Sequence, residues 1–163
     1  MRQNTRFWPD VAFMLSHPAH FLALGFGSGL SRYAPGTLGT LVALPLFMLL
    51  MMAPAATHLA ILASLYLLGV WLCRVTGKNL GIADHGGIVW DEIVAMMLVL
   101  KYTPETWQWW LIAFLLFRLF DIWKPFPIRW FDRRLKGGFG VMFDDLLAAI
   151  YAIAGLKVLQ WII

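Results

Sequence analysis

The sequence has too few charged residues for a soluble domain of its size. Only 13% of its 163 residues are charged and 61% are hydrophobic, whereas soluble domains are about 25% charged and about 45–50% apolar. A domain of this length cannot bury so much apolar surface inside itself, because its surface-to-volume ratio is too high. The excess must face something other than water, and membrane lipid is the simplest partner. We expect one integral membrane domain over residues 1–163.

Cysteine and histidine are also scarce. The single cysteine, Cys73, excludes an internal disulfide, and its apolar surroundings favour a buried, inert thiol. It does not begin a Cys-x5-Arg phosphatase motif, because Asn79 stands at the sixth position after it. There is no His/Cys cluster with zinc spacing, and no signal-peptide cleavage site follows an apolar core. The net charge of +4 is too small to indicate a nucleic-acid partner.

Five apolar stretches predict an all-α, multi-pass membrane protein. They cover residues 38–53, 59–73, 88–100, 107–123 and 141–163. A full membrane span needs about 20 residues, so the third stretch is the weakest candidate, and 88–123 is alternatively a hairpin that never crosses. The Gly-rich segment 18–30 predicts an additional short interfacial or re-entrant helix near the N-terminus.

Basic residues are distributed very unequally between the connecting segments. If all five stretches cross, the segments on one side carry a single basic residue, Lys101. The other side carries ten: Arg2, Arg6, Arg32, Arg74, Lys78, Lys124, Arg129, Arg133, Arg134 and Lys136. The positive-inside rule places this second side in the cytoplasm. We therefore predict a cytoplasmic N-terminus and a C-terminus across the membrane.

Five carboxylates lie near the predicted cytoplasmic face. Asp91 and Glu92 begin the third stretch, Asp121 ends the fourth, and Asp144 and Asp145 begin the fifth. Carboxylates at the edge of hydrocarbon are costly and usually functional, and so many like charges need protons, basic side chains or a metal. An all-oxygen cluster suits Mg²⁺. The alternative is that each acid only caps a helix.

Several residues are candidates for binding a phosphate group. Arg118, Asp121 and Lys124 are spaced three apart and share a helical face. Arg118 either belongs to an internal salt-bridge ladder or contacts phosphate, and Lys124 at the helix end is better placed for phosphate. Thr37, in the segment 35–40, either caps a helix or helps its N-terminus to bind an anion.

Two further arginines complete the predicted substrate-binding set. Arg32 precedes the first stretch and can assist Lys124 in offsetting phosphoryl charge. Arg129 belongs to the basic segment 129–136, which we expect to attract anionic head groups with about 1 kcal/mol per basic residue.

The chain resembles the phosphatidylglycerophosphatase A family. The matching segments are 25–32, 35–39, 85–92, 117–132 and 137–145, and the pattern Asp-x-Trp-Lys-Pro-x-Pro-Ile-Arg-x-Phe-Asp is very specific. The resemblance implies a Mg²⁺-dependent phosphomonoesterase of the bacterial inner membrane. Such an enzyme converts phosphatidylglycerophosphate to phosphatidylglycerol and inorganic phosphate. The family motifs fall on the following residues: Asp91, Glu92, Asp121, Lys124, Asp144 and Asp145.

We therefore predict that these six residues are catalytic and that Mg²⁺ is held among Asp91, Glu92, Asp144 and Asp145. The predicted substrate-binding residues are Arg32, Thr37, Arg118 and Arg129. One alternative is a phosphatidyl-alcohol phosphotransferase, although its motif Asp-x2-Asp-Gly-x2-Ala-Arg is absent. The other is a small proton or ion transporter, in which the acids would lie near mid-membrane. The sequence leaves open whether water or an aspartate is the nucleophile, and it does not fix the oligomeric state.

Overall fold

The computed structural model describes residues 8–162, which are helical and contain no strand, as the sequence predicts. The elements in chain order are α1 (Val11–Leu15), α2 (Pro18–Ala23), η1 (Gly25–Leu30), α3 (Pro35–Leu50), η2 (Ala55–Thr57), α4 (His58–Leu80), α5 (Trp90–Lys101), α6 (Trp107–Trp123), α7 (Ile128–Arg134) and α8 (Gly137–Ile162). Arg2 and Arg6, which the predicted topology places in the cytoplasm, lie outside the described residues.

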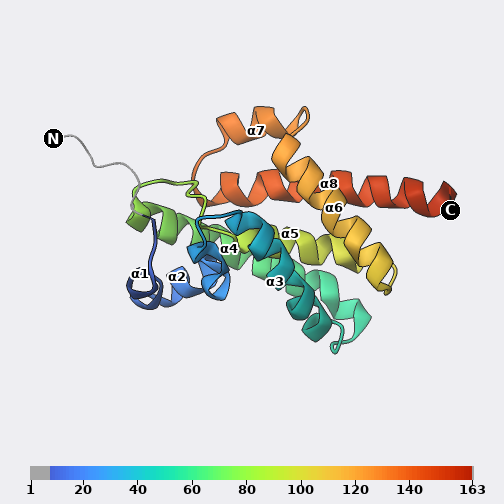
Figure 1. Ribbon diagram of the computed structural model, residues 1–163, viewed down its shortest axis with the longest axis horizontal. Coiled ribbons are helices and arrows are strands. Elements are labelled where there is room, and N and C mark those ends of the chain that lie inside the picture. The colour runs from blue at the N-terminus through green and yellow to red at the C-terminus, as the bar shows by residue number, and fades with distance from the viewer. Residues whose placement is uncertain (1–7, 163) are drawn as a thin grey trace.

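The five longer helices, α3 to α6 and α8, form an antiparallel bundle (Figure 1). Short turns separate α3 from α4 and α5 from α6, so each pair runs in opposite directions. The most extensive packing joins α8 to α4 and α6, and α5 to α3 and α8. Helices α3, α5 and α8 begin, and α4 and α6 end, towards one end of the bundle, which we call the acidic end (Figure 1).

Helix α5 is the core of this bundle. It packs against α3, α4, α6 and α8, and nine of its 12 residues are buried. At 1.5 Å per residue it is only about 18 Å long, against a hydrocarbon thickness of about 30 Å. The apolar side chains of the third stretch therefore pack mainly against other helices. This explains why the sequence signal for a membrane span is weakest there.

Two helices are long and apolar enough to cross a membrane. These are residues Ala55–Leu80, which combine η2 and α4, and Gly137–Ile162, which form α8. Helix α3 is apolar but shorter, and α6 has 17 residues. For α3, α5 and α6 the predicted crossing stays a prediction.

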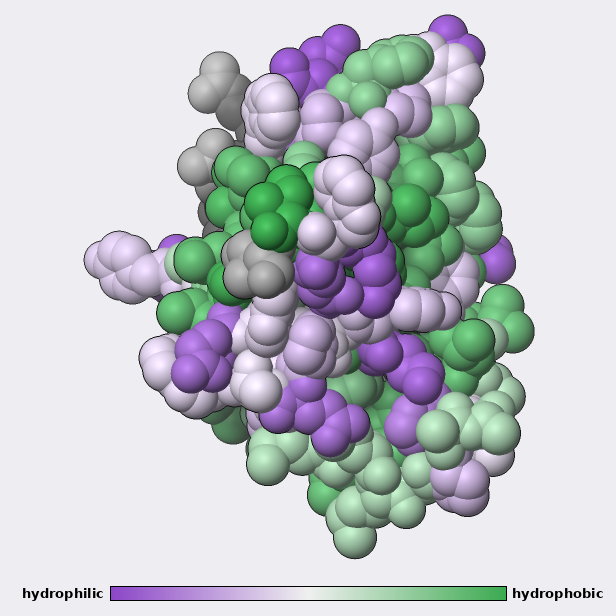
Figure 2. Space-filling model, turned by 90° about the vertical axis from the view of Figure 1, so that its right-hand side faces the viewer, coloured by the Kyte–Doolittle hydropathy of each residue, from purple (hydrophilic) through white to green (hydrophobic). Residues whose placement is uncertain are grey.

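The flanks of the bundle carry exposed apolar side chains. Examples are Leu67 on α4, Ile122 on α6 and Val158 on α8, which are 70%, 71% and 56% exposed. The end at which α8 finishes presents hydrophilic groups across the middle of its face, with hydrophobic residues around much of the margin (Figure 2). The apolar excess noted in the sequence is thus displayed along the sides of the helices.

The observed boundaries differ from the predicted stretches where glycine and proline act locally. Helix α3 begins at Pro35, because proline suits the first helical position. Helix α8 begins at Gly137 and continues through Gly138 and Gly140, although glycine disfavours a helix interior. A Cβ atom at Gly138 would lie 2.0 Å from the carbonyl oxygen of Val70, so the missing side chain allows α8 to approach α4 closely at this point. The fourth stretch coincides with α6.

Short helices lie outside the five apolar stretches. The predicted interfacial helix in 18–30 consists of α2 and η1, which contains a kink at Phe26 and Gly27. Helix α7 lies between the fourth and fifth apolar stretches and packs on α8. This helix carries Arg129, Arg133 and Arg134 next to the end of α6.

Candidate functional site: a buried acidic cluster

Three carboxylates converge at the acidic end of the bundle. Asp91 and Glu92 lie in the first turn of α5, and Asp145 lies two turns inside α8. One oxygen from each carboxylate lies within 4.8 Å of the others. Packing of α5 against α8 brings these residues together from sequence positions more than 50 apart.

Each carboxylate in this cluster has an unsatisfied oxygen. Asp91 Oδ1, Glu92 Oε2 and Asp145 Oδ2 are buried and accept no hydrogen bond from any residue that the structure describes. Burying such atoms without a partner is costly. Three hard oxygen donors in one place fit a divalent cation such as Mg²⁺, which takes a few carboxylates and completes its shell with water and phosphate oxygens. The acidic cluster thus contains three of the four metal ligands that the sequence predicts.

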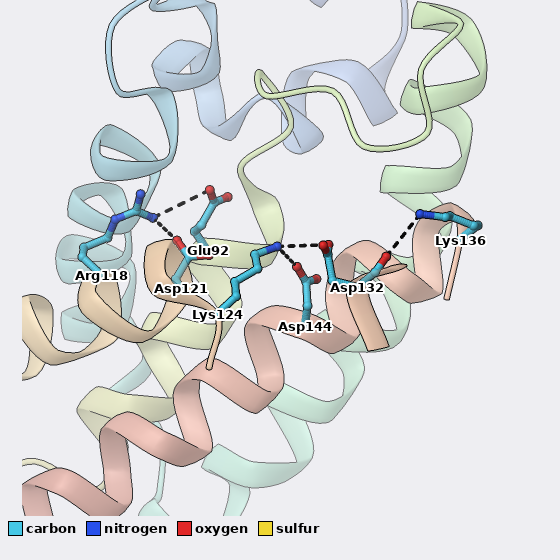
Figure 3. A network of polar contacts seen from close by, with 7 residues as sticks. All are labelled: Glu92, Arg118, Asp121, Lys124, Asp132, Lys136 and Asp144. Atoms are coloured by element: carbon cyan, nitrogen blue, oxygen red, sulfur yellow. Dashed lines mark hydrogen bonds and ion pairs between the residues drawn. The ribbon is translucent and has the colours of Figure 1, made fainter. Parts of the chain in front are cut away.

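Arg118 forms an ion-pair group beside the cluster (Figure 3). Its Nη1 lies 2.5 Å from Asp121 Oδ2 and 3.8 Å from Glu92 Oε1, and donates to Thr40 Oγ1 at 3.4 Å. Of the two interpretations of Arg118, the internal ion-pair network is therefore present. The contact with Glu92 fixes one carboxylate of the acidic cluster.

Lys124 forms a second ion-pair group (Figure 3). Its Nζ contacts Asp144 Oδ2 and lies 3.1 Å from Asp132 Oδ1. Lys124 adopts a left-handed conformation, with φ of 46°, where α6 ends before Pro125. Burial by itself lowers the pKa of Lys124, but the carboxylates of Asp144 and Asp132 outweigh burial and raise the pKa above its ordinary value. These carboxylates therefore favour the charged form of Lys124.

The start of α3 closes the site on the side of Glu92. A Cβ atom at Gly36 would lie 2.2 Å from Glu92 Oε1 and 3.1 Å from Arg118 Nη1, so only glycine permits this approach. Thr37 follows it, half-buried, in the first turn of α3. Backbone N–H groups in a first turn have no partner within the helix and suit an anion.

The structure separates the two neighbouring aspartates of α8. The predicted metal ligands were Asp91, Glu92, Asp144 and Asp145; three of them form the acidic cluster, and Asp144 instead pairs with Lys124. Both aspartates lie two turns inside α8, beyond its first turn. The alternative that they only cap this helix is therefore wrong, whereas Asp91 and Glu92 do occupy a first turn.

The remaining predicted substrate-binding arginines lie at the surface. Arg32 is exposed between η1 and α3. Arg129 is exposed on α7 and donates to the backbone carbonyl of Trp123 at 3.2 Å. Neither belongs to the ion-pair groups beside the acidic cluster.

Two residues of the site lie outside the predicted catalytic and substrate-binding sets, Asp132 and Thr40. Asp132, eight positions after Lys124, reaches the same ammonium group because α7 folds back beside the end of α6. Thr40 is buried, donates to the carbonyl of Gly36 and accepts from Arg118. Its spacing of four from Gly36, on one helical face, was the available signal.

The charges around the site do not balance. The acidic cluster and the two ion-pair groups together contain six carboxylates and two cations: Asp91, Glu92, Asp121, Asp132, Asp144 and Asp145 with Arg118 and Lys124. If all were ionised, four negative charges would remain unbalanced. Protons, bound cations or further basic side chains can supply the difference.

The fold and the site together define a helical protein with an apolar exterior and a buried acidic site at one end. The sequence model of the phosphatidylglycerophosphatase A family matches residues 21–160. The chain belongs to the phosphatidylglycerophosphatase A family, which confirms the resemblance found in its motifs.

Curated relatives agree with this assignment. A "Phosphatidylglycerophosphatase A" of Haemophilus influenzae is 50% identical over 155 residues, covering 94% of this chain and 95% of the relative. One of Escherichia coli K12 is 46% identical over 145 residues, covering 86% and 84%. A Bacteroides thetaiotaomicron protein named "Putative phosphatidylinositol-3-phosphatase" is 38% identical over 150 residues, covering 87% and 93%. No solved structure matches the chain.

Proposed function

We propose that this chain hydrolyses phosphatidylglycerophosphate to phosphatidylglycerol and inorganic phosphate at the cytoplasmic face of a bacterial inner membrane. The observation that carries the proposal is the convergence of Asp91, Glu92 and Asp145 beside Lys124. The names of the two relatives that are 46% and 50% identical support the substrate. The three clustered carboxylates would hold Mg²⁺.

The residues around the cluster have distinct roles in this proposal. Bound Mg²⁺ would supply a Lewis acid that offsets phosphate charge and favours ionisation of water. Lys124 offsets charge that develops on the phosphoryl oxygens, and Arg118 holds Glu92 and Asp121 in place. The first turn of α3 offers backbone N–H groups to the phosphate. In the overall reaction a water oxygen replaces the glycerol oxygen on phosphorus, and the released alcohol keeps one water proton.

Membrane insertion with several crossings is part of the proposal. The exposed apolar flanks of the bundle support it, as does the charge bias of ten basic residues against one. Helix α5 would cross inside the protein, surrounded by helices that face lipid. The acidic end would then lie at the cytoplasmic face, where the substrate head group is found.

The position of the acids favours an enzyme over a proton or ion transporter. Asp91 and Glu92 lie at the start of α5, Asp121 near the end of α6, and Asp145 in the first third of α8. A relay through the membrane would require ionisable groups along the length of the bundle. A phosphatase needs them together at the depth of a head group.

Phosphate release from a panel of lipids tests the activity. We expect the purified protein with Mg²⁺ to release phosphate from phosphatidylglycerophosphate much faster than from phosphatidic acid or phosphatidylinositol 3-phosphate. The last lipid is included because of the name of the Bacteroides relative. Faster release from phosphatidylinositol 3-phosphate would replace the proposed substrate, and activity on none of the panel would reject a lipid phosphatase.

Cysteine labelling tests the topology. Ala56 and Glu105 are exposed in the two turns at the end of the bundle opposite the acidic end. We expect Ala56→Cys and Glu105→Cys to react with a membrane-impermeant maleimide from the periplasm, and Lys78→Cys to react only after lysis. The native Cys73 is buried and gives little background. If Glu105→Cys is protected in intact cells while Ala56→Cys reacts, α5 and α6 form a hairpin that does not cross.

A further inference from the structure

A basic pocket adjoins the site where α6 ends and α7 folds back. This pocket has a volume of about 520 Å³ and is lined by Lys124 together with Arg129, Arg133 and Arg134 of α7. The rings of Trp123 and Trp130 form part of its wall. No acidic residue lines it, in contrast to the acidic cluster, so the pocket is suited to an anion.

The arginines of the basic pocket keep their positive charge available. The guanidinium of Arg134 lies 4.0 Å from the ring centroid of Trp130, and Arg129 donates to the carbonyl oxygen of Trp123. Both contacts orient the arginines through neutral partners. Arg118, by comparison, is paired with carboxylates. An oriented arginine without a carboxylate partner is well prepared to bind a phosphate.

Lys124 connects the basic pocket to the acidic site. It lines the pocket, and its ammonium group contacts Asp144 at the edge of the acidic cluster. A ligand that extends past Lys124 can therefore place one phosphate at the carboxylates and another among the arginines. The substrate proposed above has this form, because a glycerol unit joins its terminal phosphomonoester to an internal phosphodiester.

We propose that the basic pocket binds the phosphodiester that the reaction leaves in the product, and so selects lipids that carry a second phosphate. The proposal rests on the proposed function and adds the basis of its specificity. Exposed aromatic residues beside the pocket, Trp123 and Phe126, suit the depth of lipid head groups, where a phosphodiester lies. Phosphatidic acid, which has only the phosphomonoester, leaves the basic pocket empty.

The double variant Arg129→Gln/Arg133→Gln tests this selectivity. We expect kcat/KM for phosphatidylglycerophosphate to fall by about tenfold or more, because charge-assisted hydrogen bonds to the phosphodiester are lost. The slower hydrolysis of phosphatidic acid should change little. Both substrates are presented in micelles of an uncharged detergent, so that attraction to a charged surface does not contribute. Lys78→Gln, an exposed basic residue at the end of α4 outside the basic pocket, is the matched control and should leave the ratio unchanged.

Two results would overturn the proposal. An equal loss on both substrates would mean that these arginines affect the catalytic site in general, and no loss on either would mean that the pocket binds nothing in catalysis. If the wild type hydrolyses no lipid phosphate, the proposed function fails separately. Binding of phosphatidylglycerol, measured by native mass spectrometry, then tests the basic pocket. Binding should weaken in the double variant and persist in Lys78→Gln. Equal binding by the two variants would overturn the proposal.

Discussion

Asp145→Asn is expected to lower kcat by on the order of a thousandfold. Asn keeps the size of the side chain but supplies a neutral oxygen, so the acidic cluster loses one of its three charged ligands. Asp91→Asn should behave in the same way, since its carboxylate is buried in the same cluster. Initial rates of phosphate release at saturating lipid and Mg²⁺ measure the effect.

The same substitution should leave the folded protein as stable as the wild type or more stable. In the absence of metal, Asp145 is a buried acid among like charges, and its removal relieves repulsion by about 1 kcal/mol. Thermal unfolding in detergent without divalent cations is the measurement. A large loss of stability would mean that Asp145 is a structural residue, and the loss of activity would then carry no information about catalysis.

Asp144→Asn is the matched control, because it changes the adjacent residue of α8. Asp144 belongs to the Lys124 pair and not to the acidic cluster. Breaking this partly buried pair should destabilise the protein by about 2 kcal/mol, since Lys124 loses one of its two carboxylates. The two neighbouring variants thus differ in the sign of their effect on stability. Near-normal kcat for both variants would mean that neither aspartate of α8 belongs to the catalytic site.

Chelation is expected to abolish turnover completely and reversibly. EDTA should reduce phosphate release to background, and excess Mg²⁺ should restore it. The reason is that Arg118, beside Glu92, is the one basic side chain among the described residues that contacts the carboxylates of Asp91, Glu92 and Asp145. Circular dichroism should show that the helices persist throughout. Full activity after exhaustive chelation would reject the metal assignment.

Metal binding can also be measured without activity. A cation that binds only the folded state raises the midpoint of thermal unfolding as its concentration rises. We expect Mg²⁺ to raise the midpoint of the wild type, and to have a much smaller effect on Asp145→Asn. An equal rise in both proteins would place the bound cation elsewhere.

Hydropathy, helix-breaking residues and motifs predict the helical class, the family and the grouping of acids at one end of the bundle. Apolar runs bounded by proline and glycine define helices locally, and the prediction for 107–123 coincides with α6. Alternating directions of successive helices then bring Asp91, Asp121 and Asp145 to the same end. These conclusions need only chain order and hydropathy, which are properties of the sequence.

Which of these acids come into contact depends on how the helices pack against one another. Adjacent residues of a helix point about 100° apart, so Asp144 and Asp145 must face different neighbours. The rotation of α8 against α5 and α6 directs Asp145 to the acidic cluster and Asp144 to Lys124. The partnership of Lys124 with Asp132 likewise depends on how α7 folds back. These contacts join residues across helices, and no local pattern in the sequence determines the angle at which two helices pack.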